Sequence, residues 1–192
     1  AGLESAGAEL LSRTNPGIAM GLRVNHDNEL LADPAVREAL AIGINREEIA
    51  STVYPEGTPA ATSILSGTTP AHKDLSDRLT YDPQRAAQLL EEAGFAENSQ
   101  GVLERDGQPL ELDLLWFNVA ATNSAAVELI QQQLDQIGVK INLEEGQTAE
   151  WNSRLIEGSY DLNWSNITRA DGDILRTEYD TDLANNSRLT DT

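Results

Sequence analysis

The first regular pattern along the chain is an alternation of apolar residues over positions 18–25. Ile18, Met20, Leu22 and Val24 fall on one face of an extended segment. Alternation with a period of two residues is typical of a β-strand with one covered face. The pattern therefore predicts a strand over residues 18–25, with these four side chains packed on the same side.

Two helix starts follow in the stretch "DPAVREALAIGINREEI", residues 33–49. Asp33 before Pro34 predicts an N-cap and a first-turn proline, and Asn45 before three charged residues predicts a second N-cap. Residues 54–78 then show no period and are rich in Pro, Gly, Ser and Thr, which predicts a long irregular loop. Loops of that length in compact domains tend to be functional or disordered.

A third capped helix is predicted in "YDPQRAAQLLEEAGF", starting at Asp82 and ending at Gly94. A hairpin turning at Asp106-Gly107 leads into a strand that ends at Phe117. An amphipathic helix ending at Gly138 and the strand "VKINLEE" follow directly. Strand, helix and strand with tight joints predict a βαβ unit, whose two strands are parallel.

The last third of the chain predicts another helix, strand and helix. The helix that contains Trp151 ends at Gly158, and "YDLNWSNI" reads as the next strand. The segment "TRADGDILRTEY" predicts a loop and a short helix capped by Asp171. Together these elements predict an α/β fold with a mixed sheet flanked by helices.

Three asparagines mark the C-terminal ends of predicted strands, namely Asn25, Asn118 and Asn166. In open α/β sheets ligands bind outside these ends, so the three amides are expected to converge on a polar ligand. The alternative is that asparagine simply favours strand exits and turns. Trp116 and Trp164 lie two residues before two of these asparagines, and Trp164 is the indole that we place near the ligand.

Charge excludes nucleic acid as a partner, because 13 basic against 32 acidic residues give a formal charge of -19. The acidic residues are spread along the chain, which favours a solubilising surface, with attraction of cationic ligands as the alternative. The chain has no cysteine, and neither His26 nor His72 has a partner at ligand spacing. We predict no catalytic residue, no metal site and no cofactor; a hydrolase using Asp171 and Asp173 is a distant alternative.

Several motifs resemble one known family. The stretch "LRVNHDNELLADPAVREALAIGINREEIASTVYPEGTPA" resembles the extracytoplasmic solute-binding proteins of ABC transporters, family 5, which bind oligopeptides, dipeptides and nickel. "YDPQRAAQLLEEAGF" is similar to the family's "YDPxKAxxLLxEAGY", and "IQQQLDQIGVKINLE" to its "IQxxLxxIGIKVxLE". The motifs occur in the family's order over residues 18–179.

The resemblance implies that residues 1–192 form a single domain, the second lobe of a two-lobed periplasmic-binding-protein clamshell of type II, with the first lobe and the chain ends absent. It implies a periplasmic protein or a cell-surface lipoprotein whose signal sequence is not in this chain. It further implies a non-enzymatic protein that binds oligopeptides or dipeptides between its lobes and delivers them to ABC permease subunits. An opine, a sugar or a nickel chelate are the alternative solutes, and we expect the fragment to be monomeric.

Transfer of the family's site is less direct. In peptide binders a carboxylate just before a "DPDNF"-like segment often receives the free amine of the peptide; here that position falls near Thr168, with Arg169 beside it. Asp171 could serve instead, Arg169 could bind a ligand carboxylate, or the two could form a surface ion pair. The predicted ligand-binding residues are Asn25, Trp116, Asn118, Trp164, Asn166, Thr168, Arg169 and Asp171.

Overall fold

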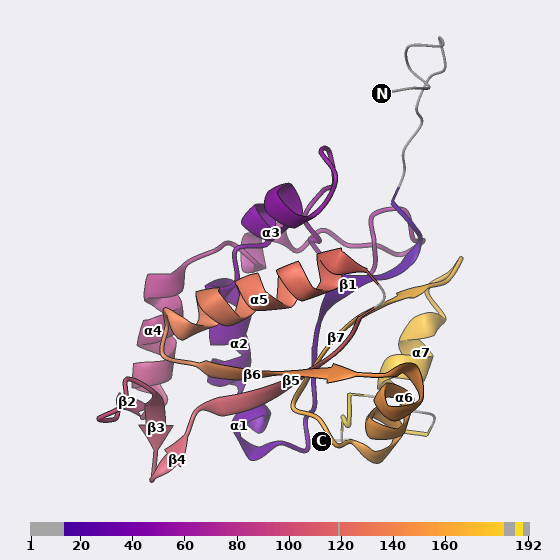
Figure 1. Ribbon diagram of the computed structural model, residues 1–192. Helices are drawn as coiled ribbons and strands as arrows, with labels where there is room; N and C mark the ends of the chain where they lie inside the picture. The colour runs from indigo at the N-terminus through magenta and orange to yellow at the C-terminus, as the bar shows by residue number, and fades with distance from the viewer. Residues whose placement is uncertain (1–13, 119, 183–186, 190–192) are drawn as a thin grey trace.

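The computed structural model describes residues 14–118, 120–182 and 187–189 (Figure 1). Its elements, in chain order, are β1 (Gly17–Val24), α1 (Glu29–Ala32), α2 (Pro34–Gly43), α3 (Arg46–Val53), α4 (Pro83–Glu92), β2 (Ala96–Glu97), β3 (Leu103–Arg105), β4 (Gln108–Pro109), β5 (Glu111–Phe117), α5 (Ala121–Asp135), β6 (Lys140–Gly146), α6 (Thr148–Glu157), β7 (Leu162–Thr168) and α7 (Ile174–Tyr179). A short 3₁₀ helix, Ser76–Arg78, interrupts the long loop after α3.

The main sheet has the strand order β1-β7-β5-β6. β5 is parallel to both β6 and β7, so the predicted βαβ unit β5-α5-β6 is confirmed. β1 runs antiparallel to β7 at one edge, which makes the sheet mixed, as predicted. The predicted hairpin is also present, as β3 and β4 of a small separate sheet with β2.

Helices cover both faces of the main sheet, and Figure 1 shows α5 on one side of β5 and β6 and α6 on the other. The first face carries the main core, in which side chains of α1 to α5 pack against Leu112, Leu114 and Leu162 of the sheet. On the second face, α6 approaches β6 closely: a Cβ on Gly146 would lie 3.2 Å from Trp151 Cβ and 3.3 Å from Leu115 Cδ1. The described residues thus form a three-layer α/β/α arrangement.

The predicted helix caps are confirmed. Asp33, Asn45 and Asp82 each accept a hydrogen bond from a first-turn backbone N–H group, over 2.9, 3.1 and 2.8 Å. Helix α1 was not predicted; Asn28 caps it by accepting from the backbone N–H groups of Leu30 and Leu31. These caps satisfy N–H groups that have no partner within their own helix.

Two local predictions are wrong. A β-bulge lies between Ile18 and Gly21, so Ile18 packs with Leu65 and Ile174, whereas Met20, Leu22 and Val24 pack against the main core. An extra residue in one strand reverses the side on which the following side chains lie, which the alternation alone cannot reveal. Asp171 does not cap α7; its N-cap is Asp173, and Asp171 Oδ1 accepts from the Asp173 backbone N–H group over 3.1 Å.

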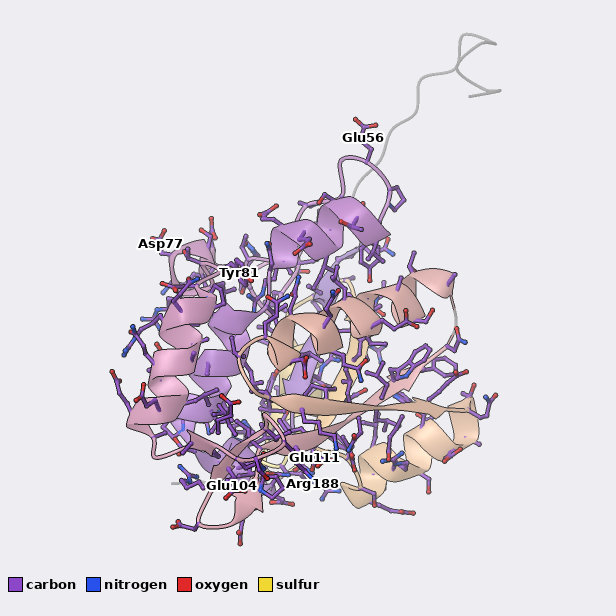
Figure 2. All side chains as sticks on the ribbon, turned by 60° about the vertical axis from the view of Figure 1, so that its left-hand side comes forward. Glu56, Asp77, Tyr81, Glu104, Glu111 and Arg188 are labelled. Atoms are coloured by element: carbon purple, nitrogen blue, oxygen red, sulfur yellow. The ribbon has the colours of Figure 1, made fainter. Side chains whose placement is uncertain are left out.

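The acidic side chains are distributed over the surface, as Figure 2 illustrates for Glu56 and Asp77 at the loops and for Glu104 and Glu111 on the strands. Glu111 is paired with Lys140 over 2.8 Å. The negative charge is therefore spread over the surface and does not form a single acidic face.

Within the described residues, no helix combines the length and the apolar character needed to cross a bilayer.

Candidate functional site

The C-terminal ends of β5, β6 and β7 meet at one edge of the sheet, because these strands are parallel. This edge brings together Asn118, which follows β5, and Asn166, Thr168 and Arg169 at the end of β7; all four side chains are exposed. Asn118 Nδ2 donates to Glu145 Oε1 over 3.1 Å. The structure therefore assembles most of the predicted polar residues at the expected edge.

Asn25 lies at the opposite edge, and the prediction that it converges with the other two asparagines is wrong. The reason is that β1 is antiparallel to β7, so its C-terminal end lies beside the start of β7. Asn25 is 4% exposed, and its Nδ2 donates to the backbone oxygens of Gly158 and Tyr160 over 2.9 and 2.8 Å. The side chain of Asn25 thus joins β1 to the turn before β7.

Trp116 and Trp164 are register partners on β5 and β7, and both point into the main core. They are 6% and 7% exposed, so neither indole lies at the surface of the predicted edge. Neither indole N–H group has a hydrogen-bond partner among the described residues. In this structure both indoles are part of the main hydrophobic core.

Arg169 and Asp171 do not form the surface ion pair that the sequence left open as an alternative. Both side chains are exposed, and no ion pair between these two residues occurs in the structure. The Arg169 backbone N–H group donates to Pro16 O over 3.1 Å, which fixes the chain next to the start of β1. Among the described residues the Arg169 guanidinium has no ion-pair partner, and the Asp171 carboxylate supports a turn.

A cavity of about 330 Å³ opens beside the C-terminal half of β7, between this strand, α6 and α7. Its volume lies at the small end of the range for sites that bind small molecules. The residues that line it are Trp151, Asn152 and Leu155 of α6, Asn163, Ser165, Asn166 and Ile167 of β7, and Glu178 of α7. Asn166 connects this cavity with the exposed residues at the end of the sheet.

The polar groups of the cavity wall form a connected network. Trp151 Nε1 donates to Asn163 Oδ1 over 3.2 Å, and Asn163 Nδ2 donates to Ser165 Oγ over 3.1 Å. The indole of Trp151 also packs against Phe117, with ring centroids 6.0 Å apart, a separation typical of aromatic pairs. The orientation of the indole is therefore held from two sides.

Arg23 of β1 lies beneath this wall and forms a buried ion pair with Glu178. The contact from Arg23 Nε to Glu178 Oε2 is 3.2 Å, and the side chains are 6% and 2% exposed. Arg23 Nη1 also donates to Ser165 Oγ, and Nη2 has no hydrogen-bond partner among the described residues. Burial lowers the pKa of Arg23 from its ordinary value, and the charge of Glu178 opposes this shift.

A second cavity of about 360 Å³ lies at the opposite edge and is lined by Asn25, Asp113 and Asp161 among others. Asp161 accepts from Asn28 Nδ2 over 2.7 Å and from the Asp113 backbone N–H group over 2.8 Å. These carboxylate bonds tie β5 and β7 to the segment before α1. Among the described residues, no group of three His, Cys, Asp or Glu side chains is placed to hold a metal ion.

The sequence prediction missed most of the cavity wall. Trp151, Asn163 and Ser165 were assigned to a helix and a strand, without a role in binding. Arg23 offered one signal, because a charged residue inside an otherwise apolar strand needs a buried partner. That partner, Glu178, could not be identified, since α7 meets β1 only in the folded chain.

Residues 3–177 match the family model described as bacterial extracellular solute-binding proteins, family 5 Middle. This chain belongs to that family. Its members are extracytoplasmic solute-binding proteins rather than enzymes, and the resemblance found in the sequence is confirmed.

Individual relatives agree with this assignment. The oligopeptide-binding protein AppA of Bacillus subtilis (strain 168) is 32% identical over 144 residues, 73% of this chain and 26% of that protein. The nickel-binding periplasmic protein of Escherichia coli (strain K12) is 27% identical over 129 residues, 67% of this chain and 25% of that protein. The chain thus spans about a quarter of the length of these relatives.

The fold is shared with a solved structure of the family. The structure of AppA from Bacillus subtilis in complex with a nonapeptide superposes with a TM-score of 0.79 at 22% identity, and the match covers 93% of this chain and 37% of that chain. The α/β arrangement described above is therefore shared with part of that binding-protein structure.

Proposed function

We propose that this chain is the second lobe of the solute-capture subunit of an ABC importer, and that it binds oligopeptides or dipeptides between two lobes. The observation that carries the proposal is the cavity between α6 and β7, which adjoins the exposed residues Asn166, Thr168 and Arg169 at the C-terminal edge of the sheet. Ligands of open α/β sheets bind at this edge.

The relatives support this solute class and supply one alternative. One of them is named as an oligopeptide-binding protein and another as a nickel-binding protein, so a nickel chelate is the alternative solute. In the proposed role the protein is not an enzyme, works outside the cytoplasm as a periplasmic protein or a lipoprotein, and delivers its solute to permease subunits. Closure of two lobes around the solute provides the binding, as in other hinged binding proteins.

Arg169 offers a test of how the edge contacts a peptide. If the guanidinium binds the carboxylate of a peptide, Arg169→Ala removes a charge-assisted hydrogen bond and weakens binding by about 1.5–3 kcal/mol. If Asp171 instead binds the peptide ammonium, Arg169→Ala leaves binding equal or tighter, and Asp171→Asn weakens it. Isothermal titration calorimetry of the full-length protein with a peptide library separates these two arrangements.

Arg176→Ala is the matched control, because it removes the same charge from an exposed position on α7. There, Arg176 Nη1 lies 3.7 Å from Asp173 Oδ1, and Arg176 Nε lies 3.6 Å from Asp180 Oδ2. This substitution is expected to leave affinity unchanged. Unchanged affinity in the Arg169 and Asp171 variants as well would move the contacts to residues 118–123 and to the cavity. Absence of binding by every peptide and by nickel chelates would refute the proposed function.

A further inference from the structure

The cavity beside β7 has a distinctive chemical composition. Its uncharged polar groups are the carboxamides of Asn152, Asn163 and Asn166 and the hydroxyl of Ser165, next to the indole of Trp151. Carboxamides both donate and accept hydrogen bonds, and a hydroxyl does the same. Such a wall satisfies a group that carries donors and acceptors but no net charge.

Glu178 is the one charged side chain among the described residues that line the cavity, and its charge is already balanced. Arg23 holds Glu178 over 3.2 Å from beneath the wall and does not line the cavity itself. A second cation in the cavity would therefore compete with a buried partner that cannot move into solvent. Cationic groups gain little there.

A carboxylate in the cavity would face the opposite difficulty. It would lose its water next to Glu178, and no cationic side chain lines the described wall to receive it. Burying a charge without a partner is costly, and the Glu178 carboxylate, which Arg23 already pairs, offers an anion no compensation. The wall thus discriminates against both signs of charge.

We infer that this cavity selects an uncharged, hydrogen-bonding group of the solute, such as a carboxamide side chain or a hydroxyl-bearing ring, and excludes a carboxylate. This inference rests on the proposed function and names the chemistry of one part of that site. The volume of about 330 Å³ accommodates one such group, and the fixed indole of Trp151 offers it a flat apolar surface.

The probes that test the inference are tripeptides of alanine in which one position, each in turn, carries Gln, Glu or Lys, together with mannotriose. Gln and Glu have nearly the same shape and differ in charge, so their comparison isolates the electrostatic effect. Calorimetry with the full-length protein is expected to show Gln at one position, or mannotriose, bound at least about tenfold more tightly than the corresponding Glu probe. A preference for mannotriose identifies a hydroxyl-bearing source, and a preference for Gln identifies a peptide carboxamide.

Asn152→Lys tests the location without disturbing the buried pair, because Asn152 is exposed at the rim. Within the described parts of the chain, its side chain bonds to Thr148 O alone, over 2.9 Å. The new ammonium is expected to improve binding of a Glu probe by about tenfold or more. Ser153→Lys is the matched control on the same helix, since Ser153 is exposed and does not line the cavity; solvent screening limits its effect to about twofold.

The outcomes separate the inference from the proposed function. Equal affinity for Gln and Glu probes, a preference for Lys probes, or the same response in both lysine variants would overturn this inference and leave solute binding intact. Failure of every probe to bind would overturn the proposed function, and this inference with it.

Discussion

The contribution of the buried Arg23–Glu178 ion pair to the free energy of unfolding can be measured by replacing its two residues. Replacing Arg23 with methionine preserves most of the side-chain volume but leaves the Glu178 carboxylate, 2% exposed, without its cationic partner. It also removes the donor to Ser165 Oγ. Removal of one partner from a buried ion pair costs about 3–5 kcal/mol, because the remaining buried charge loses its oppositely charged neighbour.

The double substitution Arg23→Met with Glu178→Leu gives the decisive comparison. It removes both charges of the buried pair, and apolar replacements of similar volume are often neutral. We expect the double variant to be more stable than either Arg23→Met or Glu178→Leu alone. The resulting coupling energy in the double-mutant cycle is about 3 kcal/mol.

Urea unfolding followed by far-ultraviolet circular dichroism measures these changes, provided that the slope of the free energy against urea is the same in all variants. The exposed pair Arg85–Glu92 is the matched control: its atoms lie 2.9 Å apart, but the side chains are 43% and 63% exposed. Breaking that pair is expected to cost less than about 1 kcal/mol. The reasoning is refuted if Arg23→Met costs no more than this control, or if the two single effects add in the double variant.

Two further predictions concern stability. Gly17 has φ +116°, and a Cβ there would lie 2.1 Å from Ile167 O, so Gly17→Ala is expected to lower the free energy of unfolding in urea by at least about 2 kcal/mol. A Cβ on Gly21 would lie 3.9 Å from Ala19 O, so Gly21→Ala, the control, is expected to change it by less than about 1 kcal/mol. Burial raises the pKa of Tyr160 to about 12, whereas an unfolded tyrosine ionises near pH 10, so this group stabilises the fold fully below about pH 10 and loses that contribution as the pH rises to about 12. Between about pH 10 and 12 the free energy of unfolding should fall by about 2–3 kcal/mol in the native chain and by clearly less in Tyr160→Phe. An equal fall in both proteins would contradict the raised pKa of Tyr160.

The elements that depend on near neighbours could be predicted from the sequence. The caps at Asp33, Asn45 and Asp82 and the parallel pairing of β5 with β6 are confirmed, because each depends on residues within one helix turn or on a short connection. Asn118 and Asn166 were also placed at the correct edge, because each follows or ends a predicted strand and the two strands, β5 and β7, are parallel.

The elements that depend on distant partners could not be predicted. The direction of β1 beside β7 moved Asn25 to the far edge, and hydrophobic alternation did not show that Trp116 and Trp164 lie beneath helices. An alternating strand specifies two faces but not which of them is covered, or by what. The candidate cavity was missed because its wall comes from three elements that are separate in the sequence.

The sequence alone determined the family, the order of most helices and strands and the acidic surface, because these follow from local hydrogen bonding, periodicity and composition. Only the tertiary structure decided which strand ends meet, which indoles are buried and that Arg23 lies against Glu178. The physical reason is that strand direction and burial are set by packing between residues far apart in the chain. A charged residue in a buried strand requires an oppositely charged partner, but the sequence does not show which residue that partner is.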